Sequence, residues 1–357
     1  MKHTVEAIRE LAALLGRPVK LMEVCGTHTV AIFRHGIRDL LPKNIRLLSG
    51  PGCPVCVTSI RDVDTILEIA AKKDVIVATF GDMMRVPGSK KSLSQARSEG
   101  SDIRIVYSPL DALKLAEANL DRKVVFFATG FETTSPLVAG TLFEAESRKI
   151  ANFFIYSVHK TVPLALKALL DASEVQIDGF ILPGHVSTII GLRPYAFLAN
   201  EYHKPSVVTG FSAPDILNSM LMLLRQAVHG SAVVENAYVK VVKEEGNPRA
   251  VSLLYEFFEP GDAAWRGIGV IPGSGLRLRE KYGHRDIMRI FDLKVPEGEE
   301  PKACSCGDVL KGIKIPTDCA LFGKACTPEK PVGACMVSTE GSCAAYYKYS
   351  ALDRQSV

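Results

Sequence analysis

Residues 123–136 read Lys-Val-Val-Phe-Phe-Ala-Thr-Gly-Phe-Glu-Thr-Thr-Ser-Pro, and this stretch decides the fold. An apolar run over 123–129 ends at Gly130, and a helix-like segment follows up to about Arg148. A nearly continuous apolar run is typical of a strand in a parallel sheet, where both faces are covered. The stretch therefore predicts a strand, a tight turn and a helix.

The same unit recurs along the chain. Apolar runs of this kind cover 20–24, 45–48, 75–79 and 103–107 in the first half, and 123–129, 153–157, 179–182 and 206–209 in the second. Strands that alternate with helices indicate right-handed crossovers and parallel sheets. The sequence thus predicts an α/β protein with two similar parallel-sheet domains, residues 20–122 and residues 123–290, followed by a cysteine-rich iron–sulfur domain. The segment after Ala232 is less regular, and Gly273-Ser274-Gly275 is expected to be only a turn.

The last part of the chain is rich in cysteine. Of nine cysteines, six follow residue 303, and the gaps between Cys306, Cys319, Cys326 and Cys343 are 12, 6 and 16 residues. Residues 291–357 contain too little aliphatic sequence for a core of their own. We expect a metal to hold them and the N-terminal helix, residues 1–19, to pack against them.

Four thiolates can bind either an iron–sulfur cluster or a structural zinc. The tail lacks the C-x2-C pairs typical of zinc ribbons, which favours a cluster held by Cys306, Cys319, Cys326 and Cys343. Cys304 could replace Cys306, because the C-x-C pair puts both thiols near the same point.

The composition is that of an ordinary globular protein. The net charge of +4 over 357 residues is too small to indicate nucleic-acid binding. No apolar run reaches the ~18 residues of a membrane span, and the first residues do not resemble a signal peptide. We therefore expect a cytoplasmic protein, in which clustered cysteines are metal ligands or redox thiols more often than disulfides.

Residues able to do chemistry gather at the carboxyl ends of the expected strands. In open parallel sheets, ligands bind outside these ends. The residues found there are Cys25, His28, Cys53, Cys56, Asp82, Glu132, Thr133, His159 and His185. This placement predicts a site between the two halves.

The cysteines among these residues allow both a functional and a structural interpretation. Cys25 is a thiolate ligand or nucleophile with His28 as proton handler, or it is a buried small hydrophobe. Cys53 and Cys56 form a C-x-x-C at a helix start, which would lower the thiolate pKa and allow a reducible disulfide. Otherwise they are half of a zinc site or two inert thiols. Glu132 could relay protons to a thiol, and His185 is an imidazole on a tight turn.

Five motifs together resemble one known family. They are Cys25-Gly-Thr-His-Thr, Gly50-Pro-Gly-Cys-Pro-Val-Cys, Gly130-Phe-Glu-Thr-Thr, Pro183-Gly-His-Val-Ser, and the tail with Cys319, Cys326-Thr-Pro-Glu and Met336-Val-Ser-Thr-Glu-Gly-Ser-Cys343. In this order they closely resemble the HypD family of [NiFe] hydrogenase maturation factors.

The resemblance implies a function. The family builds the Fe(CN)2CO unit of the hydrogenase active site with the small chaperone HypC, and HypE, charged by HypF, delivers the cyanide. It implies that Cys25 holds the iron, and that Cys53 and Cys56 exchange electrons with a [4Fe–4S] cluster. It also implies two similar α/β domains plus a cluster domain formed from both chain ends.

We therefore expect a redox-active assembly scaffold rather than a conventional turnover enzyme, with Glu132 and His185 as possible proton donors. One alternative is an iron–sulfur-dependent reductase of a disulfide in a protein substrate. Another is a binding protein whose cluster is only structural.

Overall fold

The computed structural model describes residues 1–172, 174 and 176–353 and contains two parallel sheets. The first sheet has the strand order β2-β1-β7-β8-β9, and the second has the order β4-β3-β5-β6. The strands of the first are β1 (Val19–Glu23), β2 (Ile45–Ser49), β7 (Gly179–Pro183), β8 (Ser206–Thr209) and β9 (Val234–Asn236). Those of the second are β3 (Val75–Thr79), β4 (Ile103–Ile105), β5 (Lys123–Ala128) and β6 (Phe153–Ser157). The predicted α/β class with parallel sheets is confirmed.

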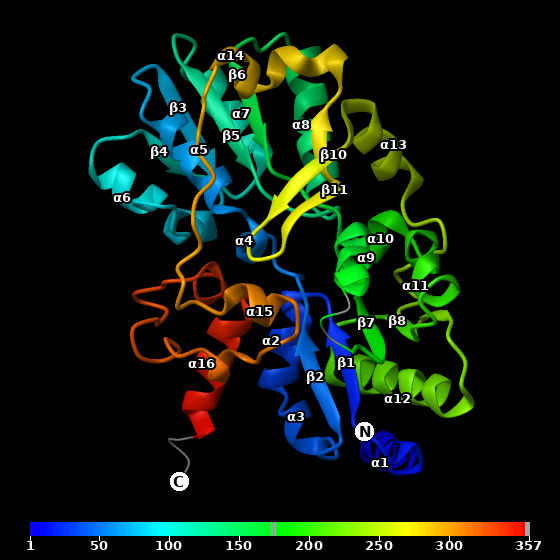
Figure 1. The fold of residues 1–357 in the computed structure, drawn as a ribbon. Coiled ribbons are helices and arrows are strands. Elements are labelled where there is room, and N and C mark those ends of the chain that lie inside the picture. The colour runs from blue at the N-terminus through cyan, green and yellow to red at the C-terminus, as the bar shows by residue number, and fades with distance from the viewer. Residues whose placement is uncertain (173, 175, 354–357) are drawn as a thin grey trace.

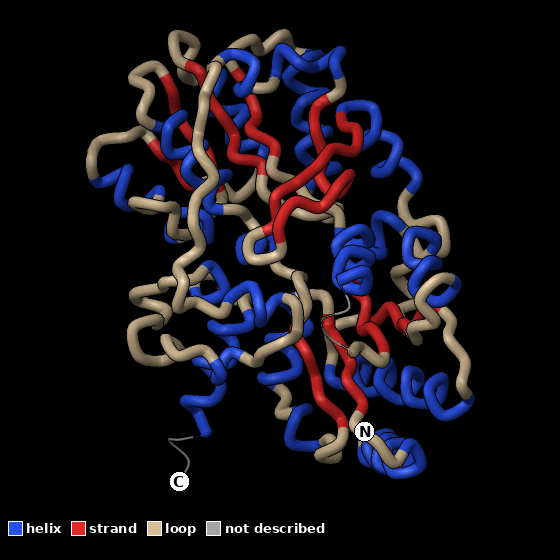
Figure 2. Tube along the Cα trace, viewed as in Figure 1, coloured by secondary structure: helices blue, strands red, loops and turns tan. Residues whose placement is uncertain are grey.

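Helices cover both sheets, as Figures 1 and 2 show. Around the first sheet lie α1 (Lys2–Leu15), α2 (Gly26–Arg34), α3 (Ile37–Leu40), α9 (Val162–Ala172), α10 (Gly184–Ile190), α11 (Ala196–Asn200) and α12 (Ala213–His229). Around the second lie α5 (Ile60–Ala70), α6 (Leu93–Ser98), α7 (Pro109–Glu117), α8 (Ser135–Ser147), α13 (Pro248–Phe257) and α14 (Ile287–Ile290). The short helix α4 (Pro54–Val57) lies in the connection between the two sheets.

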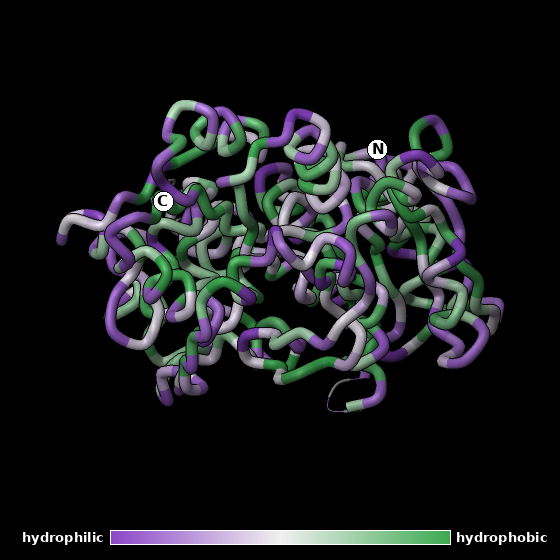
Figure 3. Tube along the Cα trace, turned by 90° about the horizontal axis from the view of Figure 1, so that it is seen from above, coloured by the Kyte–Doolittle hydropathy of each residue, from purple (hydrophilic) through white to green (hydrophobic). Residues whose placement is uncertain are grey.

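The packing of the stretch over 123–129 explains why residues 124–128 are all apolar. Phe126 packs into the core on one face of the second sheet with Val124 and Ala128. Phe127 packs into the core on the other face with Val125. Both faces are covered, so every position of β5 after Lys123 is buried. Figure 3 shows hydrophobic segments concentrated inside the molecule and hydrophilic ones on the outer loops.

The division of the chain between the sheets differs from the predicted boundary at residue 122. β1 pairs with β7 as well as with β2, and β3 pairs with β5 as well as with β4. The chain thus leaves the first sheet after β2, builds the whole second sheet, and returns to the first at β7. The domains 20–122 and 123–290 are therefore replaced by two interleaved lobes. Alternation along the sequence identifies strands but not their neighbours, which are sequential only about two-thirds of the time.

An antiparallel hairpin follows α13. It consists of β10 (Phe258–Trp265) and β11 (Gly269–Leu278), with an irregularity between Gly261 and Ala263. Gly273-Ser274-Gly275 lies within β11 and is not simply a turn. Figure 1 shows the hairpin running from the second sheet towards the middle of the molecule, where the indole of Trp265 is buried.

The cysteine-rich tail shares its core with the rest of the protein. It contains α15 (Cys306–Leu310), α16 (Ser342–Asp353) and short 3-10 turns at Pro316–Asp318 and Ala334–Met336. Cys306, Cys335 and Met336 belong to the same buried cluster as Val24 and Cys56. The tail packs against α2 and α4, which agrees with its lack of an aliphatic core.

The N-terminal helix does not take the expected place against this tail. Its apolar face, Val5, Ile8 and Ala12, packs on α12 beside the first sheet. The amphipathic pattern predicted a helix correctly, but such a pattern does not say which apolar face it meets. No helix among the described residues is long and apolar enough to cross a membrane.

The packing of α1 gives a stability prediction. Ile8 is fully buried against α12, whereas Leu14 of the same helix is 73% exposed. Ile8→Ala should lower the free energy of unfolding by about 2–5 kcal/mol, because it removes buried methyl groups and leaves a cavity. Leu14→Ala is the matched control and should change it by less than about 0.5 kcal/mol. Equal effects in chemical denaturation would contradict this placement of α1.

Candidate functional site

Cys25 lies where three strand-end loops meet. It follows β1 and is the N-cap residue of α2. The amide of Gly26 donates to the carbonyl oxygen of Gly52 at 3.2 Å. A Cβ at Gly52 would lie 2.3 Å from the amide nitrogen of Cys25, so only glycine allows the loop of Cys53 to approach this closely. The Gly50-Pro-Gly-Cys motif thereby brings its cysteines beside Cys25.

Cys25 is partly exposed as a residue, and its thiol carries a proton at neutral pH. Burial raises its pKa to about 11, and the negative charge of Glu340 contributes. Glu340 comes from the tail and accepts a hydrogen bond from Thr27 Oγ1 at 2.7 Å. A metal bound at Cys25 would therefore have to displace this proton.

Glu23 is a carboxylate behind Cys25 that the sequence analysis did not select. One of its oxygens accepts from the amide of Cys25 at 3.3 Å, and the other accepts from Thr29 Oγ1 at 2.5 Å. Burial raises its pKa to about 7, although these hydrogen bonds oppose the shift. A buried acid inside an apolar strand was the available signal, because Lys, Glu, Arg and Asp are rarely buried without a reason.

The two predicted histidines lie on either side of Phe211. His28 is fully buried, and its Nε2 lies 3.0 Å from the carbonyl oxygen of Gly210. A carbonyl only accepts, so Nε2 carries the hydrogen, and Nδ1 has no partner among the described residues. Burial lowers the pKa of His28 to about 4. The ring of Phe211 stacks on His28 at 4.6 Å and on the exposed His185 at 4.0 Å between centroids.

Glu132 follows β5 of the second sheet and is buried. Its Oε1 accepts from the amide of Val162 at 3.0 Å, while Oε2 has no partner among the described atoms. Burial raises its pKa to about 7. The buried hydroxyl of Tyr195, also without a described partner, lies where the charges of both Glu132 and Cys25 affect its pKa. The charge of Glu132 in the second lobe thus acts on the Tyr195 hydroxyl in the first lobe.

Cys53 and Cys56 are both buried, and Cys56 faces the tail. The amide of Cys56 donates to the sulfur of Cys53 at 3.4 Å. The Cys335 thiol lowers the pKa of Cys56, but contact with Cys53 and burial outweigh it and hold that pKa well above its usual value. The predicted lowering by a helix dipole is therefore wrong for Cys56, since α4 is a single turn and the thiol is buried.

All six tail cysteines surround one pocket. It is lined by Cys304, Cys306, Cys319, Cys326, Cys335 and Cys343. The sulfurs of Cys306 and Cys335 are 2.7 Å apart, and Cys335 also lies next to Cys56. The tail pocket and the C-x-x-C pair are thus connected through Cys335, which the sequence analysis left without a role.

The donor set of the pocket suits a metal centre. Six thiols line it, and four thiolates can hold either an iron–sulfur cluster or a zinc ion. Among the described residues, no three Cys, His, Asp or Glu side chains already converge as ligands of one ion.

Three predicted residues lie elsewhere. His159 is buried at the end of β6, where its Nδ1 lies 3.1 Å from Ser157 Oγ, and burial lowers its pKa to about 3. Asp82 accepts from Ser338 Oγ of the tail at 2.8 Å. Thr133, beside Glu132, is exposed. His159 therefore packs in the interior, and Asp82 holds the tail to the second lobe.

Comparison with known proteins places this arrangement in a family. The HypD family model, whose description is "Hydrogenase formation hypA family", matches residues 1–350. The chain belongs to the HypD family. It is 49% identical over 345 residues to the hydrogenase maturation factor HypD of Rhodobacter capsulatus, covering 95% of this chain and 92% of that protein.

Two further relatives of the HypD family are similar over nearly their full length. The HypD protein of Escherichia coli K12 is 46% identical over 350 residues, which cover 98% of this chain and 94% of that protein. A putative hydrogenase expression/formation protein of Methanocaldococcus jannaschii is 46% identical over 349 residues, covering 98% and 97%. The resemblance identified from the five motifs is confirmed.

The burial of Glu132 predicts a pH dependence. Its pKa is about 7 in the folded protein against 4.5 for an ordinary glutamate. The folded state therefore holds the proton longer, and its stability falls as pH rises between these two values. Glu132→Gln keeps an oxygen for the Val162 amide but cannot ionise. As the pH rises from 4.5 to 7, the free energy of unfolding of Glu132→Gln should therefore increase relative to that of the wild type, by about 1–3 kcal/mol.

Chemical denaturation at the two ends of this window measures the effect. Glu144→Gln, an exposed change on α8, is the control for loss of a carboxylate. A difference between Glu132→Gln and wild type that stays constant with pH would contradict the burial of an ionisable Glu132.

Proposed function

We propose that this HypD-family chain is a cytoplasmic hydrogenase maturation factor that acts as a scaffold for the Fe(CN)2CO unit. The observation that supports this most is the position of Cys25. Cys25 is partly exposed, lies beside the Cys53 loop, and is close enough to Glu340 of the tail for that carboxylate to raise the pKa of its thiol. A site built from both lobes and the tail suits assembly better than the turnover of a small substrate.

The iron is cargo of this scaffold, with the Cys25 thiolate as its protein ligand. Cyanide and CO favour low-spin Fe(II), and a soft thiolate suits that ion. The partial exposure of Cys25 leaves the other coordination positions open to ligands and to a partner cysteine. Glu23, in contact with the Cys25 backbone and with a pKa of about 7, can take up the proton that the thiol releases.

The tail is proposed to hold a [4Fe–4S] cluster as resident cofactor. The initial ligand set was Cys306, Cys319, Cys326 and Cys343. The contact between Cys306 and Cys335 favours Cys304 in place of Cys306, which leaves four thiols for four irons. A bound cluster would supply single electrons at low potential. Cys306 and Cys335 then remain as two exchangeable thiols in the wall of this pocket, and Cys335 lies next to Cys56.

The proposed partners are a HypC-type chaperone that contributes a second cysteine to the iron, and HypE as cyanide donor, with HypF upstream. Glu132 and His185 are proposed to supply protons near the reaction. The buried Glu132 suits this role because its pKa is close to neutral.

A thiol/disulfide reductase is the second candidate, because Cys53, Cys56, Cys335 and Cys306 form a connected series of thiols. It would reduce a protein disulfide repeatedly and would not need Cys25. The variant Cys25→Ser therefore distinguishes the two functions.

Cys25→Ser should abolish hydrogenase activity in cells that lack their own HypD-family protein and receive this chain instead. Serine has nearly the same size but is a harder and far less acidic donor, so the iron should not be held. The variant should fold normally and keep the metal content of its tail. Thr161→Ser, a change of similar size away from Cys25, is the control and should support full activity. If cells with Cys25→Ser had hydrogenase activity close to that of the wild type, the scaffold proposal would be contradicted.

Anaerobically purified protein should contain about four irons and four sulfides per chain. Cys319→Ser and Cys326→Ser should lose them and destabilise the tail, because metal binding contributes folding free energy. Cys304→Ser should lose iron whereas Cys306→Ser should retain it. The reverse result would restore Cys306 as the ligand, and one zinc in place of iron would refute the cluster.

A further inference from the structure

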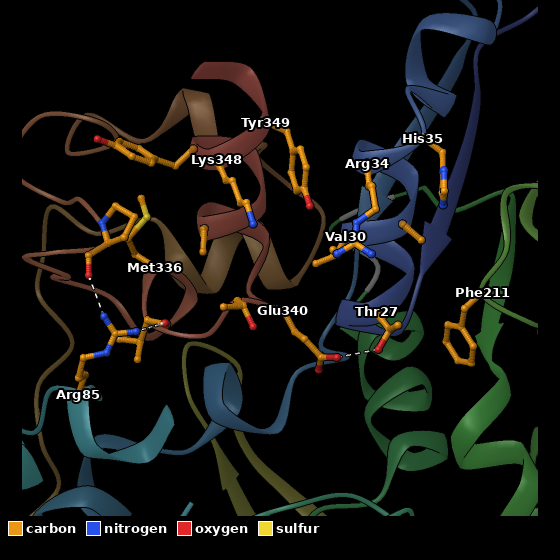
Figure 4. Close-up of a pocket in the computed structure, with 16 residues that line it drawn as sticks. Thr27, Val30, Arg34, His35, Arg85, Phe211, Met336, Glu340, Lys348 and Tyr349 are labelled. Carbon is orange, nitrogen blue, oxygen red and sulfur yellow. Dashed lines mark hydrogen bonds between the residues drawn. The ribbon is translucent and has the colours of Figure 1, made fainter. Parts of the chain in front are cut away.

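A groove lies between α2 and the tail, beside the Cys25 site. Its volume is about 690 Å³, within the roughly 300–1,000 Å³ of small-molecule pockets. One wall is α2, with Val30 and Arg34, and the opposite wall is α16, with Lys348 and Tyr349. Figure 4 shows Arg34 on α2 and Lys348 on α16, with Tyr349 between them.

The charges of the groove are unbalanced. Arg34 and Lys348 are exposed, and neither forms an ion pair with a carboxylate of the described chain. Arg85 donates to the carbonyl oxygens of Pro328 at 3.1 Å and Val337 at 2.9 Å, so its charge is not neutralised either. Glu340 is the lining carboxylate, and it is engaged by Thr27. The groove therefore presents an excess of positive charge to an occupant.

Much of the remaining lining is apolar or aromatic. Phe211, Met336, Tyr347 and Tyr349 contribute to it. Phe211 is the ring that stacks between His28 and His185, so this wall of the groove is also a wall of the Cys25 site. Thr27 and Glu340 also line the groove, and Figure 4 shows the hydrogen bond that joins them. Such a lining suits a ligand with an apolar or planar body as well as a charge.

We propose that this groove binds a small organic anion, whose carboxylate or phosphate group lies between Arg34 and Lys348 and whose apolar body packs against the aromatic wall. Arg and Lys both bind these groups through charge-assisted hydrogen bonds. The inner end of the ligand reaches Thr27 and Glu340, next to Cys25. The groove is thus a second binding site, and its occupancy does not depend on iron at Cys25.

Titration calorimetry on the full chain with simple probes tests this. Benzoate and phenyl phosphate carry the two candidate groups on the same planar body, and benzamide is the neutral control of the same shape. At least one anion should bind saturably at one site per chain, about tenfold or more tighter than benzamide. The tighter of the two anions identifies the group that the groove prefers.

Variants locate the binding. Arg34→Gln and Lys348→Gln should each weaken the tighter anion by about tenfold. Arg97→Gln, an exposed arginine on α6, is the matched control and should leave binding unchanged. Cys25→Ser should also bind normally, which separates this site from the proposed maturation function.

Three results would overturn the proposal. The first is the absence of saturable binding of both anions, including the case in which only an acidic protein segment binds. The second is equal affinity for benzoate, phenyl phosphate and benzamide. The third is binding that Arg34→Gln and Lys348→Gln leave unchanged.

Discussion

The site depends on the pairing of β1 with two strands that are far apart in the sequence. β1 hydrogen-bonds in parallel with β2 on one side and with β7 on the other. Parallel strands end at the same edge of a sheet, so the loops that carry Cys25, Cys53 and His185 become neighbours. Gly52 allows the loops of Cys25 and Cys53 to approach closely, because any side chain there would collide with the Cys25 backbone.

The tail packs against this edge of the sheet and shares its core with it. Its buried residues share one core with Val24 and Cys56, and Arg85 and Asp82 of the second lobe bind its backbone and side chains. Glu340 reaches Thr27, and Cys335 reaches Cys56. Folding of the tail on the body therefore brings the six-thiol pocket and the Cys25 site together. A metal in the pocket would stabilise that contact, because binding to the folded state alone favours folding.

The sequence predicted the strands well and their arrangement less well. The apolar runs at 75–79, 153–157 and 206–209 coincide with β3, β6 and β8, because burial on both faces leaves a clear signal. The hairpin β10–β11 was missed, since Pro260, Gly261, Pro272 and Gly273 weaken strand propensity. Packing around Phe258 and Trp265 overrides that local preference.

The site was predicted from strand ends, and its supporting residues were not. The strand-end rule does place Cys25, Cys53 and His185 correctly at one edge. Glu23, Phe211 and Glu340 act through contacts between segments distant in sequence, such as the hydrogen bond between Thr27 and Glu340. No local pattern encodes such contacts. The same holds for Cys335, whose position between Cys306 and Cys56 exists only in the folded chain.

The central claim is that Cys25 holds an iron carrying cyanide and CO. Infrared spectroscopy of the protein purified with its small partner tests it most directly, since C≡N and C≡O stretches fall in a region free of protein bands. The account predicts these bands in the wild-type complex and their loss in Cys25→Ser, with the iron of the tail unchanged. Bands of wild-type intensity in Cys25→Ser would contradict it and place the iron elsewhere.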